Sequence, residues 1–295
     1  MIMRLHMQFQ NTSLLVLLSL GLMTTAQAGV DGLSTNVQNI AVGTAEAGAS
    51  VPGNHQGGSV ALSVQAAPAE RYRSYMGVTT LQTLASAFTA AGSSNSNQTV
   101  AVSGADNLNL KVSSIPVSAM PASHGFLGNF NFAQVLETSG NVGNLPNTYF
   151  GEWWGGADSV NGTTHTVYYA GDNTARSVPT SGTAVYTVAG VNNGTGLAGK
   201  FNVNFNDQEI TAGSLTGGTG ATKTITISNV GFDAPTGLIS SSAYGGSVSA
   251  TNQANSTIGS GTLTGHFFGE GASTLGAVVE FNDQKYNTAI GGVKN

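Results

Sequence analysis

Strict alternation of apolar and polar residues runs through Lys200-Phe201-Asn202-Val203-Asn204-Phe205-Asn206. Because successive side chains of a β-strand point to opposite faces, Phe201, Val203 and Phe205 are predicted to face inward. Just upstream, Asn193-Gly194 is a strong short-range signal of a two-residue hairpin turn. The stretch therefore predicts a half-buried strand in a region built of antiparallel hairpins.

Similar alternating runs extend from about residue 181 to residue 295. They give eight candidate strands, at residues 183–189, 200–206, 209–216, 222–230, 243–250, 261–268, 274–281 and 286–293. This regular spacing is typical of a β-sandwich or a closed β-barrel. Eight strands can close into a barrel whose interior side chains just fill it, and closure removes exposed strand edges.

Residues 29–180 have a more mixed pattern. A helix is predicted within residues 68–91, where Tyr72, Met76, Leu84 and Phe88 have compatible spacing, although Gly77 weakens the pattern. Strand-like runs lie at residues 98–103, 108–113, 149–154 and 163–170, and loops rich in Gly, Asn and Pro lie at 51–58, 116–128 and 140–146. We interpret this part as an α+β domain whose loops bind a ligand, with its boundary near Pro179-Thr180.

The N-terminus has the pattern of a secretory signal peptide. Arg4 supplies a positive charge, residues 14–23 are mostly apolar, and Ala26-Gln27-Ala28 matches a signal-peptidase site. The apolar run is shorter than the about 20 residues that cross a bilayer. We expect residues 1–28 to be removed after Ala28 and the remainder to be secreted; the alternative is a buried core helix.

The composition excludes several classes of protein. The chain has no cysteine, which excludes disulfides, Cys-ligated zinc, covalent c-type haem and a bacterial lipid anchor. Only 8% of residues are charged, and no run of Lys or Arg is present to bind nucleic acid. The high glycine content could indicate disorder, but 40% hydrophobic residues and clear alternation argue against it.

Catalytic motifs are absent from the sequence. It contains no G-x-S-x-G elbow, no H-E-x-x-H, no Walker loop and no cysteine nucleophile. The 14 carboxylates are scattered without close pairing. We therefore predict a binding protein and not an enzyme.

Histidines are the most informative polar residues. His55 and His124 lie on predicted loops flanked by Gly and Pro, where a side chain can reach into a cleft. The commoner meaning of such a residue is a solvated imidazole. His165 and His266 lie on predicted strands and are expected to be barrel-wall or surface residues.

Three features favour a haem-ligand interpretation of His55 and His124. Neutral imidazole is the usual protein ligand of haem iron, and the absence of Cys removes the covalent and thiolate alternatives. Near His124, the rings of Phe126, Phe130 and Phe132 could form apolar walls. Candidate partners for the two propionates are grouped on one segment: Arg71, Tyr72, Arg73 and Tyr75. The alternative for that segment is a solvated helix face with buried tyrosines.

Two stretches resemble the hemophilin family of secreted bacterial haem-binding proteins. One is Tyr149-Phe150-Gly151-Glu152-Trp153-Trp154 with the later Thr166-Val167-Tyr168-Tyr169-Ala170-Gly171-Asp172. The other is Gly265-His266-Phe267-Phe268-Gly269-Glu270-Gly271-Ala272 with Leu275-Gly276-Ala277 and Phe281. The second stretch is also similar to lipoproteins related to transferrin-binding protein B, but this chain lacks their lipidation cysteine.

The resemblance implies a mainly β protein with two domains. Residues 29–180 would form a clamp-like haem-binding domain and residues 181–295 an eight-stranded antiparallel β-barrel. Haem b would be held non-covalently by His124 and His55. The resemblance also implies export by a Slam-type outer-membrane modulator and delivery of haem to a TonB-dependent outer-membrane receptor of a Gram-negative bacterium, for iron acquisition.

Two other functions remain open at this point. Relatives of the same superfamily engage host proteins, so a secreted or surface module that binds a host protein without haem is the main alternative. A secreted hydrolase is a third reading, and no nucleophile–base pair in the sequence favours it.

Overall fold

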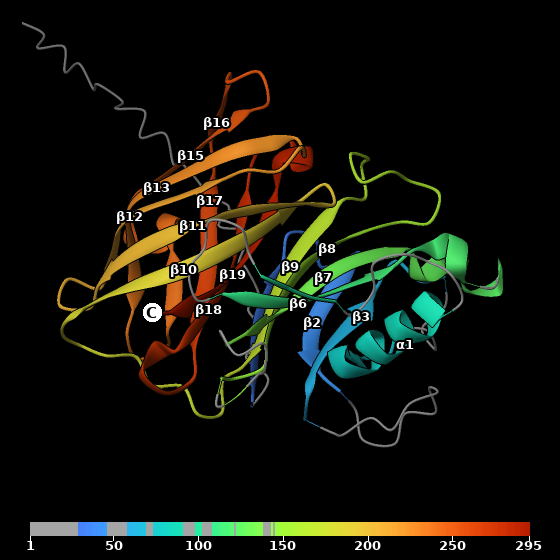
Figure 1. The fold of residues 1–295 in the computed structure, drawn as a ribbon, viewed down its shortest axis with the longest axis horizontal. Coiled ribbons are helices and arrows are strands. Elements are labelled where there is room, and N and C mark those ends of the chain that lie inside the picture. Colours follow the sequence, from blue (N-terminus) through green and yellow to red (C-terminus); the bar gives the residue numbers. More distant parts are fainter. Residues whose placement is uncertain are drawn as a thin grey trace, which may run out of the picture.

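The computed structural model describes residues 29–45, 58–68, 73–90, 98–101, 108–120, 122–137, 143 and 145–295. The predicted signal peptide, residues 1–28, lies outside the described residues. Figure 1 shows two β-rich bodies side by side, with the C-terminal one at the left and the N-terminal one at the right. The predicted mainly β class is confirmed.

The C-terminal body is a closed antiparallel barrel. Its ring contains eight strands, and pairing of β12 with β13 closes it. In ring order these are β12 (Glu209–Thr216), β11 (Thr195–Asn204), β10 (Thr183–Asn192), β19 (Thr288–Lys294), β18 (Thr274–Glu280), β17 (Thr262–Phe268), β14 (Leu238–Ser240) and β13 (Thr222–Asp233).

The alternating stretch behaves as predicted. Phe201, Val203 and Phe205 are all buried in the barrel core, whereas Asn202 is exposed. The turn before them is Asn193-Gly194, with φ of 51° and 73°. Both residues thus adopt the left-handed conformation that a tight hairpin requires and that Asn and Gly tolerate best.

One predicted barrel strand lies outside the ring. The run at 243–250 corresponds to β15 (Ser247–Asn252), which pairs with β13 and with β16 (Thr257–Ser260). The ring is completed instead by the three-residue strand β14, which is too short to show an alternating pattern. A short helix, α2 (Ser241–Tyr244), follows β14, and 3-10 turns η4 (Glu270–Ala272) and η5 (Gln284–Tyr286) connect later strands.

The N-terminal body contains two antiparallel sheets. The larger has the order β1-β9-β8-β7-β6-β5, and the smaller has the order β2-β3-β4. The larger sheet comprises β1 (Val30–Ser34), β9 (Thr166–Asp172), β8 (Thr148–Trp154), β7 (Asn129–Leu136), β6 (Asn109–Ile115) and β5 (Gln98–Ala101). The smaller comprises β2 (Ile40–Thr44), β3 (Val60–Val64) and β4 (Met76–Gly77).

The predicted helix is shorter than expected. It is α1 (Val78–Ala90), which begins directly after β4 and buries Val78, Leu81 and Ala85 on one face. Met76 lies in β4, because it pairs with Leu62 of β3, so its predicted place in the helix is wrong. Tyr72 lies outside the described residues. None of the helices in the described part of the chain has both the length and the apolar character that a membrane crossing requires.

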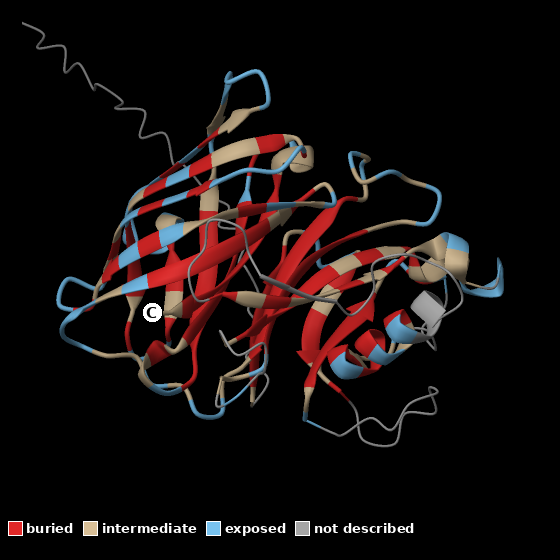
Figure 2. Cartoon of the chain, in the orientation of Figure 1, coloured by how far each residue is buried: buried red, intermediate tan, exposed pale blue. Residues whose placement is uncertain are grey.

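A shared apolar core joins the two bodies. Phe150, Val167 and Tyr169 of the large sheet pack in one buried cluster with Phe268 and Val278 of the barrel. Figure 2 shows the buried strands facing one another where the bodies meet. The last strand of the sheet ends at Asp172 and the first of the barrel begins at Thr183; the boundary at 179–180 stays a prediction.

Candidate functional site

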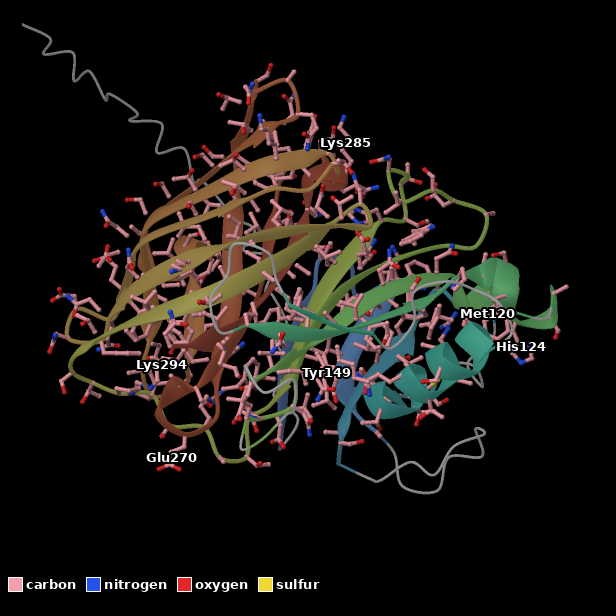
Figure 3. All side chains as sticks on the ribbon, viewed as in Figure 1. Met120, His124, Tyr149, Glu270, Lys285 and Lys294 are labelled. Atoms are coloured by element: carbon pink, nitrogen blue, oxygen red, sulfur yellow. The ribbon has the colours of Figure 1, made fainter. Side chains whose placement is uncertain are left out.

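His124 lies on a short 3-10 helix at the edge of the N-terminal domain. This helix, η3 (Ala122–Leu127), follows η2 (Val117–Ala119), and neither contains a buried residue. Figure 3 shows His124 and Met120 together on the side of the domain that faces away from the barrel. His124 is exposed, so its ring is accessible to a ligand from solution.

The neighbours of His124 form a half-buried apolar surface. The ring of Phe126 stacks on the imidazole, with ring centroids 6.1 Å apart and an angle of 27° between the planes. Three partly buried hydrophobic side chains of this segment pack against the core of the domain: Met120, Phe126 and Leu127. A flat apolar ligand such as a porphyrin requires apolar walls of this kind.

One nitrogen of His124 has a partner and the other does not. Ser123 Oγ lies 3.1 Å from Nδ1, whereas Nε2 makes no hydrogen bond within the described residues. An imidazole whose Nδ1–H donates to Ser123 presents the lone pair of Nε2 to a metal. Where the chain is described, no group of three or more His, Asp or Glu side chains could bind a metal ion. Haem fits such a site because the porphyrin supplies four of the iron's ligands.

The structure describes only some of the other predicted site residues. His55, Arg71 and Tyr72 lie outside the described residues. Arg73 is exposed, and its Nε donates to the carbonyl of Ala67 at 3.1 Å; Tyr75 is half-buried. Both precede α1, so they do not belong to a helix face. Their proposed role toward the propionates stays a prediction.

The side chains of Phe130 and Phe132 are buried in the domain core and do not form a wall that a ligand could contact. Both are 2% exposed and belong to the core between the large sheet and α1. They support the site from below, whereas Phe126 of η3 is half-buried beside His124.

His165 is a buried hydrogen-bonded residue between the two domains. It lies just before β9, not on a barrel wall or the surface as expected. Its Nε2 donates to Glu152 at 3.0 Å, and its Nδ1 lies 3.0 Å from the carbonyl of Gln284. Both ring nitrogens therefore have a partner within the protein. His165 is therefore not available as a haem ligand.

His266 of β17 is also buried between the domains. Its Nδ1 lies 2.7 Å from the hydroxyl of Tyr169, within hydrogen-bond distance. Burial lowers the pKa of His266 to about 4; the nearby Asp31 carboxylate raises it in part and Arg176 lowers it further. The ring is thus neutral near pH 7 and is committed to the domain interface. Arg176, in the segment before the barrel, forms an ion pair with Asp31 of β1.

Two residues at the site are not among those that the sequence predicts. Met120 lies four residues before His124 and packs against the core of the domain. Trp153 of β8 donates its indole N–H to the carbonyl of Leu127 at 2.7 Å. A sequence signal for Trp153 does exist, since Trp153 and Trp154 are the only tryptophans of the chain.

Two family models account for most of the chain. Residues 24–166 match the HphA N-terminal heme-binding domain. Residues 176–294 match the HphA C-terminal domain. This chain belongs to the HphA family. The resemblance to hemophilins is thereby confirmed, and the match to the haem-binding domain covers η3 and every strand of the large sheet except β9.

Solved structures with a similar arrangement are transferrin-binding proteins and a surface lipoprotein. Transferrin-binding protein B of Haemophilus parasuis, as a double mutant, is 13% identical with a TM-score of 0.38, over 66% of this chain and 42% of that one. The protein from Neisseria meningitidis is 16% identical with a TM-score of 0.33, over 56% and 33%. A structure described as a surface lipoprotein is 16% identical with a TM-score of 0.36, over 50% and 76%. This chain spans less than half the length of both transferrin-binding proteins.

Proposed function

We propose that this haem-binding protein is a diffusible haemophore that binds haem b without a covalent link. The observation that carries the proposal is the exposed imidazole of His124 beside a half-buried apolar surface in the haem-binding domain. His124 would be one axial ligand of the iron and His55 the other. The absence of cysteine leaves no residue for thioether attachment.

The chemistry of this ligand set suits a carrier. When bound between two imidazoles, haem iron has no open position for oxygen or peroxide. Phe126, Met120 and Leu127 would cover apolar porphyrin surface at one side. The exposed guanidinium of Arg73, of which only Nε is hydrogen-bonded within the described residues, would pair with a propionate.

Titration with haemin tests the proposal. We expect a sharp Soret band of a low-spin, six-coordinate complex, weakened in His124→Ala and in His55→Ala and lost in the double variant. Tyr244→Ala is the matched control, because Tyr244 is an exposed aromatic side chain on the barrel. An unchanged band in the double variant would contradict the assignment. If no band forms and serum pull-down recovers a protein, the chain binds a host protein instead.

Secretion and delivery belong to the same proposal. The signal-peptide pattern in residues 1–28 supports export, and the resemblance supports a Slam-type modulator and a TonB-dependent receptor. Expression in a Gram-negative host with and without such a modulator tests export. We expect protein that begins at Gly29 in the medium only when the modulator is present, and protein that stays cell-associated in both strains would contradict it.

A further inference from the structure

The segment that carries His124 is attached to the sheet at its C-terminal end by one buried side chain. Trp153 is 1% exposed, and its indole N–H donates to the carbonyl of Leu127, the last residue of η3, at 2.7 Å. A buried indole N–H requires an acceptor, and the last carbonyls of a helix have no partner within it. Each group therefore satisfies the other.

The backbone after η3 lies directly against the same indole. Gly128 has φ of +70°, and a Cβ added there would lie 2.6 Å from Trp153 Nε1 and 2.5 Å from the carbonyl oxygen of Trp154. Only glycine meets both conditions, the left-handed conformation and the close approach. The contact between Trp153 and the end of η3 thus depends on two residues, Trp153 itself and Gly128.

The N-terminal end of the segment has a second attachment. The backbone N–H of Val117, the first residue of η2, donates to Oδ1 of Asn129 at 2.9 Å. Between these two attachments, η2 and η3 contain no buried residue. The position of His124 therefore depends on where the two ends are held.

We propose that Trp153 is the positioning residue for the His124 ligand. Its indole N–H fixes the position of Leu127 at the end of η3, three residues beyond His124. This bond thereby restricts the imidazole to one position beside the apolar surface. A ligand that is held in place before binding loses less conformational entropy when the iron arrives. This inference rests on the proposed function, in which His124 binds the iron.

The test compares the same substitution at two adjacent tryptophans. Trp153→Phe removes the N–H and keeps an aromatic ring. Trp154→Phe is the control, because Trp154 is half-buried on the same strand and its indole makes no hydrogen bond within the described residues. The haem complexes are mixed with excess apomyoglobin, and the transfer rate is followed together with the electron paramagnetic resonance spectrum of the ferric complex.

We expect Trp153→Phe to release haem roughly 3- to 10-fold faster, the effect of one neutral hydrogen bond. Its ferric g-values should spread as the imidazole loses a single orientation, whereas Trp154→Phe should match the wild type in both. If Trp153→Phe matches the wild type while His124→Ala loses haem, Trp153 has no positioning role and the proposed function stands. If His124→Ala keeps its haem unchanged, the proposed function fails as well.

A second measurement covers the case in which Trp153→Phe does not fold. With only two tryptophans, the ¹⁵N-labelled wild-type protein gives two indole N–H signals. The Trp154→Phe variant keeps only the Trp153 signal and so identifies it. We expect the Trp153 signal to be protected from solvent exchange and to shift on haem binding. Fast exchange of both signals would overturn the inference.

Discussion

The carboxylate of Glu152 accepts the backbone N–H of Gly194 at 2.6 Å, although the two residues belong to different domains. Glu152 lies in β8 of the large sheet, and Gly194 lies in the hairpin turn between β10 and β11. The same carboxylate accepts the N–H of Asn193 at 2.9 Å, the amide of Asn131 at 3.0 Å and Nε2 of His165 at 3.0 Å. The fully buried carboxylate of Glu152 thus accepts hydrogen bonds from both domains. These bonds fix the orientation of the barrel relative to the haem-binding domain.

Removal of this carboxylate should destabilise the whole molecule. Glu152→Ala leaves one buried and three partly buried donors without their acceptor, and we expect the free energy of unfolding to fall by about 3–5 kcal/mol. Glu152→Gln, which keeps one acceptor oxygen, should cost less. Urea unfolding monitored by tryptophan fluorescence measures both. Glu270→Ala, at an exposed glutamate of η4, is the control, and an equal loss there would contradict the account.

The buried imidazole of His266 should make stability fall as the pH falls below neutral. Its pKa is about 4 in the folded protein, against an ordinary value of 6.5. Above pH 6.5 the ring is neutral in both states. Between pH 6.5 and 4 only the unfolded state takes up the proton, so His266 should reduce the free energy of unfolding by up to roughly 3 kcal/mol.

His266→Gln separates this effect from those of other groups. Glutamine can still accept the hydroxyl of Tyr169 but does not titrate. The difference in unfolding free energy between wild type and variant, measured by urea at several pH values, should narrow or reverse as the pH drops from 7 to 4. A difference that stays constant over that range would show that His266 is not held neutral by burial.

Two adjacent tyrosines should respond oppositely to loss of the hydroxyl. The hydroxyl of Tyr168 is buried and has no hydrogen-bond partner among the described residues, whereas that of Tyr169 is bonded to His266. An unpaired buried hydroxyl is unfavourable, so Tyr168→Phe should raise stability by about 1 kcal/mol and Tyr169→Phe should lower it by about 1 kcal/mol. Thermal unfolding of both variants measures this, and a destabilised Tyr168→Phe would refute the first expectation.

The barrel was predictable because its strands have one buried and one exposed face. Phe201 and Val203 are buried and Asn202 is exposed, so the alternation is visible in the sequence. In the N-terminal domain, β1 and β3 are buried at every position. Strands covered on both faces show no alternation. For this reason the sequence pattern did not reveal β1 and β3. β7 was not predicted because it directly follows a stretch with the composition of a loop.

The site was only partly predictable for a related reason. The loop position of His124 and the nearby Phe126 follow from the local sequence. The burial of His165 and His266 does not, because their partners include Gln284 and Tyr169, 119 and 97 residues away. Likewise, the bond between Trp153 and Leu127 joins two elements whose proximity only the folded sheet establishes.

The most direct test of the central claim is chemical rescue of the His124 ligand. His124→Gly removes the imidazole from an exposed helix that contains no buried residue, so the fold should persist. Haemin is titrated into this variant with and without millimolar imidazole. The account predicts that the low-spin Soret band is weakened in the variant and returns to its full intensity when free imidazole is added. A variant that binds haemin as the wild type does, without added imidazole, would contradict it.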